Sequence, residues 1–361
     1  MLVANSSMSG ERKLLRLSVL DLSPVPSGST PQQALRNTLN LARLADDLGY
    51  ARYWLAEHHS TKLIATSAPE IMIGHVADVT RQIRVGSGGV MLPNHAPLKV
   101  AESFRMLEAL HPGRIDLGLG RAPGTDSLTA LALRRSREAM EADDFPQQLS
   151  ELMAFLGPGF PEGHPFHHVK AMPDDVPSPE IWLLGSSDFS AQLAAQRGLR
   201  FAFAHHIQPE PAIRALRMYH DFFRPSAALA KPEALIGLSV LVADTEKRAL
   251  QLRACMDLTL LRFHQSKSGR FPSMEEAEDY PYTDEDRRII EYNRQRYFAG
   301  TPEAAREHIE RLAGEGGVGE VMITSMIHDH AERRRCYELL AKVFELTPSP
   351  APAGRDANDT D

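Results

Sequence analysis

Short apolar segments and longer amphipathic segments alternate along most of this chain, and the alternation limits the folds it can adopt. A helical pattern follows most of the strand-like runs, which is typical of parallel strands joined by helices. Eight such repeats favour an α/β fold, a (β/α)8 TIM barrel, over an open doubly wound sheet. The predicted strands are 15–21, 53–58, 83–90, 114–119, 181–184, 201–204, 235–242 and 320–324.

The first predicted helix carries clear signals at both ends. Thr30 can cap its amino end, and Pro31 suits the first helical position because its fixed φ angle is already helical. Gly49 follows the last apolar position of the stripe, as expected of a residue that ends a helix in the left-handed conformation. The sequence therefore predicts a helix between Thr30 and Gly49.

Two segments interrupt the repeat, as insertions after strands 4 and 7. The first contains a charged helical region over about 127–156 and a Pro-, Gly- and His-rich loop over about 157–179. The second covers about 266–282 and has no apolar period. Loops of this length in a compact barrel are often lids, although a mobile surface insertion would have the same pattern.

Length and composition suggest how the chain is divided. Its 361 residues correspond to one large α/β domain or two ordinary ones, and the eight strand–helix repeats favour a single barrel domain over 15–346. Residues 1–14 are polar and are expected to be a flexible N-terminus. Residues 347–361 are rich in Pro, Ala and Asp, so we expect a disordered C-terminal tail.

The charge and cysteine content exclude several classes of protein. A net charge of −7 offers no basic surface for nucleic acid or for an anionic membrane. No apolar run is long enough to span a membrane, and the first residues lack the apolar core of a secretory signal. The two cysteines, Cys255 and Cys336, cannot form a disulfide framework, which favours a cytoplasmic location.

The second predicted strand, from Tyr53 onward, ends on Glu57, His58 and His59. Active sites of parallel α/β proteins lie at the carboxyl ends of the strands. A histidine at that edge is a candidate acid or base because its ordinary pKa is near neutral pH. A capped, solvated strand end is the alternative interpretation of this segment.

Residues at three further strand ends could bind a ligand that has a flat part and a negatively charged part. Gly88 and Gly89 allow a ligand to approach the backbone, although a tight turn explains them as well. Arg121 follows the fourth strand, where a guanidinium can bind a phosphate through two hydrogen bonds. The helix after the fifth strand opens with hydroxyl residues whose neighbouring N–H groups are free to bind an anion, although an ordinary helix cap explains them as well, namely Ser186, Ser187 and Ser190.

Other motifs carry less information. The glycines from Gly118 to Gly124 have the wrong spacing and the wrong strand for a dinucleotide fingerprint. His205, His206 and His328 also follow strands and are possible liners of a pocket. No histidine or cysteine spacing matches a metal site, so no metal is expected.

Taken together, these segments resemble the bacterial luciferase-like monooxygenases, flavin-dependent enzymes related to the luciferase α subunit. The resemblance extends over roughly 15–344 and includes several motifs in the same order and spacing. They are 48–50 with 53–59, 85–93, 113–121, 182–190, 194–199 and 300–303.

The resemblance implies a barrel that binds FMN at the carboxyl ends of its strands. It assigns His58 as the catalytic base and places a non-proline cis peptide, under the flavin ring, at Gly88-Gly89. Arg121 and Ser187 match the phosphate-binding positions, with Ser186 and Ser190 beside them.

This chain also departs from luciferase at two of these positions. Ser186 stands where luciferase has a carboxylate, and Gly120 stands where luciferase has a reactive cysteine. The resemblance is therefore to the single-component relatives, which do not emit light.

The activity implied is oxidation of a small apolar organic substrate by O₂, through a flavin C4a-(hydro)peroxide. A separate NAD(P)H:flavin reductase would supply the reduced FMN, in agreement with the missing dinucleotide fingerprint. Alternatives are an F420-dependent hydride-transfer oxidoreductase and a non-catalytic flavin-binding protein.

The resemblance also implies a homodimer formed by the second and third helices. An apolar patch there could form the interface, although a stripe facing the barrel would explain the same residues. These residues are Ala68, Ile71, Met72, Val79, Phe104 and Leu107.

Overall fold

The computed structural model describes residues 15–267 and 269–348. The expected flexible segment 1–14 lies outside the described residues, as does 349–361 of the expected tail. Thr347, at the start of that tail, lies against the end of the first helix, because a Cβ atom added to Gly49 would come 2.4 Å from its carbonyl oxygen.

Eight parallel strands form a closed barrel, which confirms the predicted fold. Neighbours pair in chain order, and the last strand pairs with the first, in the register Arg16 with Glu320. The eight strands are β1 (Arg16–Asp21), β2 (Arg52–Leu55), β3 (Arg84–Ser87), β5 (Ile115–Gly120), β6 (Glu180–Gly185), β7 (Arg200–Ala204), β8 (Ala234–Val242) and β10 (Glu320–Thr324).

Two additional short strands were not predicted. The expected strand 83–90 is split, since the chain turns at Gly88-Gly89 and continues as β4 (Val90–Met91), which pairs with β5. β9 (Tyr297–Gly300) pairs with the carboxyl half of β8.

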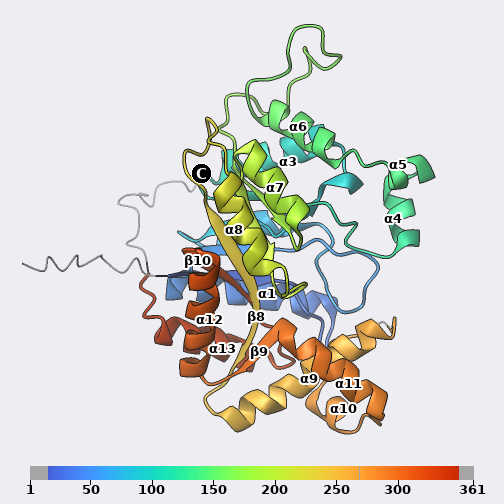
Figure 1. Ribbon diagram of the computed structural model, residues 1–361, viewed down its shortest axis with the longest axis vertical. Helices are drawn as coiled ribbons and strands as arrows, with labels where there is room; N and C mark the ends of the chain where they lie inside the picture. Colours follow the sequence, from blue (N-terminus) through green and yellow to red (C-terminus); the bar gives the residue numbers. More distant parts are fainter. Residues whose placement is uncertain (1–14, 268, 349–361) are drawn as a thin grey trace, which may run out of the picture.

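Helices surround the barrel (Figure 1). The predicted caps of the first helix are present: the Thr30 hydroxyl accepts a hydrogen bond from the Gln33 amide, and Gly49 has φ 86°. The helices outside the insertions are α1 (Pro31–Leu48), α2 (Pro69–Val79), α3 (Pro97–Leu110), α7 (Asp188–Arg197), α8 (Ala212–Phe222), α12 (Pro302–Gly316) and α13 (His330–Val343), with the 3₁₀ turn η1 (Leu92–Asn94).

The insertion after β5 contains three helices, where the sequence suggested one charged helical region. Its helices are α4 (Ser127–Arg134), α5 (Arg137–Glu141) and α6 (Phe145–Leu156). Arg135 ends α4 in the left-handed conformation with φ 71°, and Ser136 then caps α5. A long loop follows α6 and leads to β6.

The insertion after β8 lies elsewhere around the barrel, in yellow and orange in Figure 1. It comprises α9 (Glu246–His264), α10 (Met274–Glu278), α11 (Asp284–Asn293) and η2 (Arg294–Arg296). Phe271 is fully buried, and its backbone pairs with the loop after β1 at 2.8 and 2.9 Å. This part of the expected lid is therefore attached to the barrel rim.

The barrel interior contains a small apolar layer at mid-height. Trp54 and Trp182 meet edge to face there, with ring centroids 5.4 Å apart. They pack with Leu20, Ala56, Ala202, Leu235 and Met322. A second and larger apolar cluster lies outside the strands, between sheet and helices.

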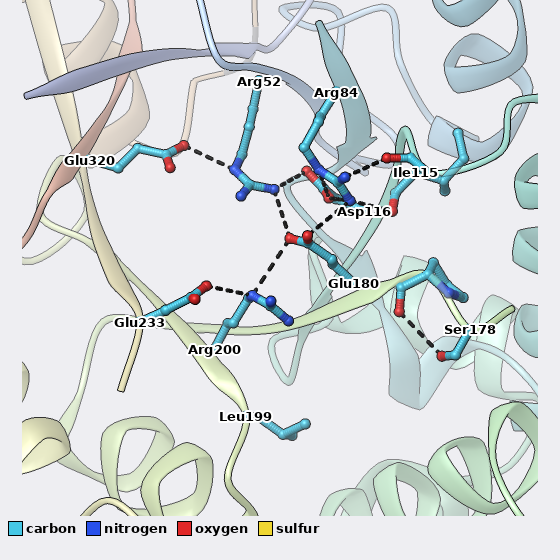
Figure 2. Close-up of polar contacts among 12 residues, drawn as sticks. Arg52, Arg84, Ile115, Asp116, Ser178, Glu180, Leu199, Arg200, Glu233 and Glu320 are labelled. Carbon is cyan, nitrogen blue, oxygen red and sulfur yellow. Dashed lines mark hydrogen bonds and ion pairs between the residues drawn. The ribbon is translucent and has the colours of Figure 1, made fainter. Parts of the chain in front are cut away.

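Below this layer, the amino ends of the strands carry a set of ion pairs that we call the charged ring. Each barrel strand contributes one residue at or next to its first position. Four arginines, Arg16, Arg52, Arg84 and Arg200, pair with four carboxylates, Asp116, Glu180, Glu233 and Glu320. Figure 2 shows most of this network.

Arg52 is the centre of the charged ring. Its guanidinium donates to Asp116 at 2.7 Å, to Glu320 at 3.0 Å and to Glu180 at 3.1 Å, as Figure 2 shows. Burial alone would lower the pKa of Arg52, but these three carboxylates raise it above its usual value. Burial likewise opposes ionisation of Glu180, and the surrounding arginines nevertheless hold its pKa below the usual value.

Candidate active site

A cavity opens at the carboxyl ends of the strands, on the side of β3, β5, β6 and β7. It brings together all six residues predicted to bind the cofactor, Gly88, Gly89, Arg121, Ser186, Ser187 and Ser190. Its apolar lining includes Leu20, Trp54, Met91, Leu184, Leu235 and Met322.

Glycine keeps the floor of this cavity open. The Gly88–Gly89 peptide is cis, as the resemblance implies. A Cβ atom on Gly88 would lie 2.7 Å from a methyl group of Leu20, and one on Gly89 would lie 2.7 Å from the Gly118 carbonyl oxygen. The backbone thus forms a thin surface that a flat ring can approach.

The opposite end of the cavity suits an anion. Ser187 is the N-cap of α7, but its hydroxyl makes no capping hydrogen bond, so the first N–H groups of the helix are available. Arg121 stacks on the ring of Phe189 with 4.3 Å between guanidinium carbon and ring centroid. The nearby carboxylate of Asp188 pairs with Arg214 at 2.8 Å.

His58 lies in a neighbouring cavity. That second cavity is lined by Val25, Pro31, His58, Ser60, Thr61, Lys62, Ile64, Ala65, Ser67 and Arg270. Within residues 15–267 and 269–348, the buried Nδ1 of His58 has no hydrogen-bond partner. Burial lowers the pKa of His58 to about 4, with His59 and His206 adding to the effect and Glu57 opposing it. The imidazole is therefore neutral at neutral pH and can accept a proton.

Glu57 organises the segment around His58, a role that the sequence analysis missed. Its buried carboxylate meets His59 Nε2 at 2.8 Å and His95 Nε2 at 2.9 Å, and it accepts a hydrogen bond from the Met91 amide at 2.9 Å. These contacts connect the end of β2 to β4. Burial opposes ionisation of Glu57, but the hydrogen bonds hold its pKa below the usual value.

The remaining strand-end histidines occupy different positions. His206 lines the first cavity, and its Nδ1 lies 3.1 Å from the Gly237 carbonyl oxygen. His205 is nearly buried, and burial lowers its pKa to about 4, but it is absent from the lining of that cavity. His328 meets the Ser27 carbonyl at 3.0 Å, on the loop after β1. Of these three predicted liners, His206 alone lines the first cavity.

The glycine run of β5 has a packing explanation. A Cβ atom on Gly118 would lie 2.0 Å from the Ser87 carbonyl oxygen, and one on Gly120 would lie 3.0 Å from the Met91 sulfur. Gly118 therefore allows β3 and β5 to approach, and Gly120 leaves room at the cavity wall. In the part of the chain that the structure describes, no helix is long and apolar enough to cross a membrane, and no cluster of potential metal ligands occurs.

Comparison with known proteins identifies relatives of the whole barrel. The model of the luciferase-like monooxygenase family matches residues 15–319. A curated Escherichia coli protein named luciferase-like monooxygenase is 40% identical over 333 residues, covering 92% of this chain and 98% of its own. The N-acetyl-S-alkylcysteine monooxygenase of Bacillus subtilis is 35% identical over 329 residues, covering 91% and 98%.

Solved structures show the same fold. The crystal structure of apo-MsnO8 superposes with a TM-score of 0.85 at 39% identity, covering 93% of this chain and 99% of its own. The oxygenating constituent of 3,6-diketocamphane monooxygenase from Pseudomonas putida, solved in complex with FMN, has a TM-score of 0.67 at 21% identity, covering 91% and 98%. An F420-dependent secondary alcohol dehydrogenase has a TM-score of 0.61 at 15% identity, covering 92% and 98%.

Proposed function

This chain belongs to the luciferase-like monooxygenase family, and from that premise we propose that it is an FMN-dependent monooxygenase acting with O₂ on a small organic substrate. One observation carries the proposal. A single cavity combines a thin glycine floor, an apolar wall and an anion-binding end formed by Arg121 and the start of α7.

The residues of this cavity fit FMN. Gly88 and Gly89 would support the flat ring system, since no side chain projects from them into the cavity. Arg121, Ser187 and the free N–H groups of α7 would hold the phosphate, with Ser186 and Ser190 beside them. When bound and reduced, FMN supplies the electrons that allow one atom of O₂ to enter the substrate and the other to leave as water.

His58 is the proposed base. Its neutral imidazole can take a proton from the reacting groups and return it later in the cycle. The backbone amide of His58 donates to the Thr66 carbonyl oxygen at 3.1 Å, and Glu57 fixes the neighbouring His59. These contacts fix the backbone on both sides of the His58 side chain, and its Nδ1 has no hydrogen-bond partner among the described residues.

The electrons are proposed to come from a separate NAD(P)H:flavin reductase. The glycines of β5 are explained by strand packing, which leaves no motif for a nicotinamide cofactor in the sequence. The substrate is proposed to be a small, largely apolar organic molecule, because most of the cavity wall is apolar. The two free, buried cysteines agree with a cytoplasmic enzyme.

A homodimer remains part of the proposal, but the interface differs from the predicted patch. Met72, Phe104 and Leu107 are buried against the barrel, so they cannot form it. The large apolar side chains that α2 and α3 expose are Ile71, Met106 and Leu110, at 62%, 54% and 67%. Sedimentation as a monomer at micromolar concentration would remove this part of the proposal.

Anaerobic titration with reduced FMN, followed by a pulse of O₂ in a stopped-flow instrument, tests the function. We expect tight binding and then a transient absorbance that differs from both reduced and oxidised FMN. Binding without any transient would favour a non-catalytic flavin-binding protein. Absence of FMN binding, with binding of F420 instead, would favour hydride transfer.

A further inference from the structure

The cavity beside His58 differs chemically from the cavity proposed for FMN. Its lining contains two cations, Lys62 and Arg270, together with three hydroxyl residues, and it contains no carboxylate. Neither cation takes part in an ion pair among those that the described residues form. A chain with a net charge of −7 thus presents two uncompensated positive charges at one opening.

Arg270 is held in position from two sides. Its guanidinium donates to the Ser29 carbonyl oxygen at 2.5 Å, across the gap between the insertion and the loop after β1. The next residue, Phe271, is fully buried and pairs through its backbone with Val25 and Ser27. The cation therefore comes from an anchored segment, which reduces the entropy lost on binding a ligand.

Lys62 reaches the same cavity from another part of the chain. It belongs to the loop between β2 and α2, only four residues after the proposed base, His58. Ser60, Thr61 and Ser67 on this loop add hydroxyl donors. An anion in the cavity would consequently have partners on two separate segments of the barrel rim.

We propose that this second cavity binds the carboxylate of an organic acid, and that Lys62 and Arg270 thereby select acids as substrates. The inference rests on the proposed function, because it assigns a substrate class to the same enzyme. The carboxylate would lie between the two cations, and the uncharged part of the molecule would extend along Val25, Ile64 and Ala65 toward His58.

The two cavities adjoin each other, so one substrate can extend from the second toward the first. Met91 lines the first cavity, and its amide donates at 2.9 Å to Glu57, the residue directly before His58, which lines the second. At long range the net negative charge of the chain repels an acid. Specific cations at the opening are therefore needed to bind one.

The test compares octanoate with octanamide, its uncharged isostere, on the full chain loaded with oxidised FMN. Ligand-observed NMR titration gives both dissociation constants without any turnover. The variants are R270M and K62M, and the matched control is K267M, which removes an exposed cation of the same insertion that lies outside the cavity.

We expect octanoate to bind about tenfold more tightly than octanamide, since a hydrogen bond to a charged group contributes this much. R270M and K62M should each remove most of that preference, and R270K should retain part of it. K267M should leave it unchanged. Equal binding of acid and amide, or an equal loss in K267M, would overturn the proposal.

Two further binding measurements distinguish a substrate carboxylate from the other anions that the second cavity could bind. If R270M weakened binding of FMN but not of riboflavin, Arg270 would hold the flavin phosphate, and the substrate assignment would be wrong. Inorganic phosphate that competed as strongly as octanoate would indicate a general anion site and overturn it too. Normal FMN binding with no preference for the acid would refute this inference and leave the proposed function standing.

Discussion

The two ends of the barrel are built from the same eight strands, yet their polar groups are arranged in opposite ways. At the amino ends, four arginines and four carboxylates pair with one another in the charged ring. At the carboxyl ends, several buried polar atoms have no partner within the described residues, among them His58 Nδ1, Ser239 Oγ and Thr324 Oγ1.

This difference separates stability from function within one sheet. A closed end whose charges are paired holds the strands together, whereas an end with unused donors and acceptors is able to bind and react with a ligand. Unpaired polar groups reduce stability, so the paired end compensates for them. Substitutions at the two ends should therefore change different measured quantities.

Substitution of Arg52, the central residue of the charged ring, should give the largest of the expected effects, a loss of stability. Arg52→Met removes the buried cation that joins three carboxylates and leaves Asp116 with Arg84 and Glu320 with the exposed Arg16, which we expect to cost about 3 kcal/mol in the free energy of unfolding. Urea titration measures this change. Turnover per folded molecule should remain that of the wild type.

The outer member of the ring is the control. The Arg16 side chain is 58% exposed, and its pairing with Glu320 should contribute less than about 1 kcal/mol. An equal loss in Arg16→Met and Arg52→Met would show that burial does not determine the strength of the ring.

His58→Ala should have the converse effect, at the other end of the barrel. Loss of a general base should lower product formation about a hundredfold, while FMN affinity changes by no more than several-fold. The free energy of unfolding should not fall, because the substitution removes a buried and unpaired nitrogen. Single-turnover kinetics and urea titration measure the two quantities, and an unchanged product yield would disprove the assigned role.

Arg121→Met should produce a smaller and more specific change. If the guanidinium binds the flavin phosphate, FMN affinity should fall about tenfold, and riboflavin affinity should not change. Fluorescence titration with both flavins measures this difference. Arg137→Met, at an exposed arginine on α5, serves as the matched control.

Acid should destabilise the two ends over different pH ranges, and this is the smallest of the expected effects. The pKa of folded His58 is about 4 against a usual 6.5, so only the unfolded chain takes up a proton between these values. Stability should therefore fall as pH falls from 6.5 to 4, and His58→Ala should make this slope shallower.

The carboxylates of the charged ring act at lower pH. The pKa of Glu180 is held below its usual 4.5, so its contribution to stability is present above pH 4.5 and is lost as pH falls through the folded value. Glu180→Gln should change the slope only below pH 4.5. A change in the slope of stability against pH near pH 6 instead would contradict the assignment of different pH ranges to the two ends of the barrel.

Local patterns were enough to predict most of the fold. Apolar runs identified the eight barrel strands, and Thr30 with Gly49 identified the limits of α1, because these signals depend on neighbouring residues. β9 was missed, since Tyr297–Gly300 is a short run whose strand character comes from pairing with β8.

Interactions between distant residues could not be predicted in the same way. Arg52 and Glu320 are 268 positions apart and meet only after the barrel closes. The contact of His95 with Glu57 depends equally on the fold. Strand-end position brought Arg121, Ser187 and the glycines into one cavity, but it did not reveal that His58 opens into a second one.

The order of charges along the chain has a consequence for biosynthesis. Arg16, Arg52 and Arg84 are translated first, and their carboxylate partners begin at Asp116 and end at Glu320. A nascent chain therefore carries three cations whose complete neutralisation must wait until the last strand leaves the ribosome. Until then β1 and β8 each have an unpaired edge, so the unfinished barrel exposes backbone N–H and C=O groups that can pair with other chains.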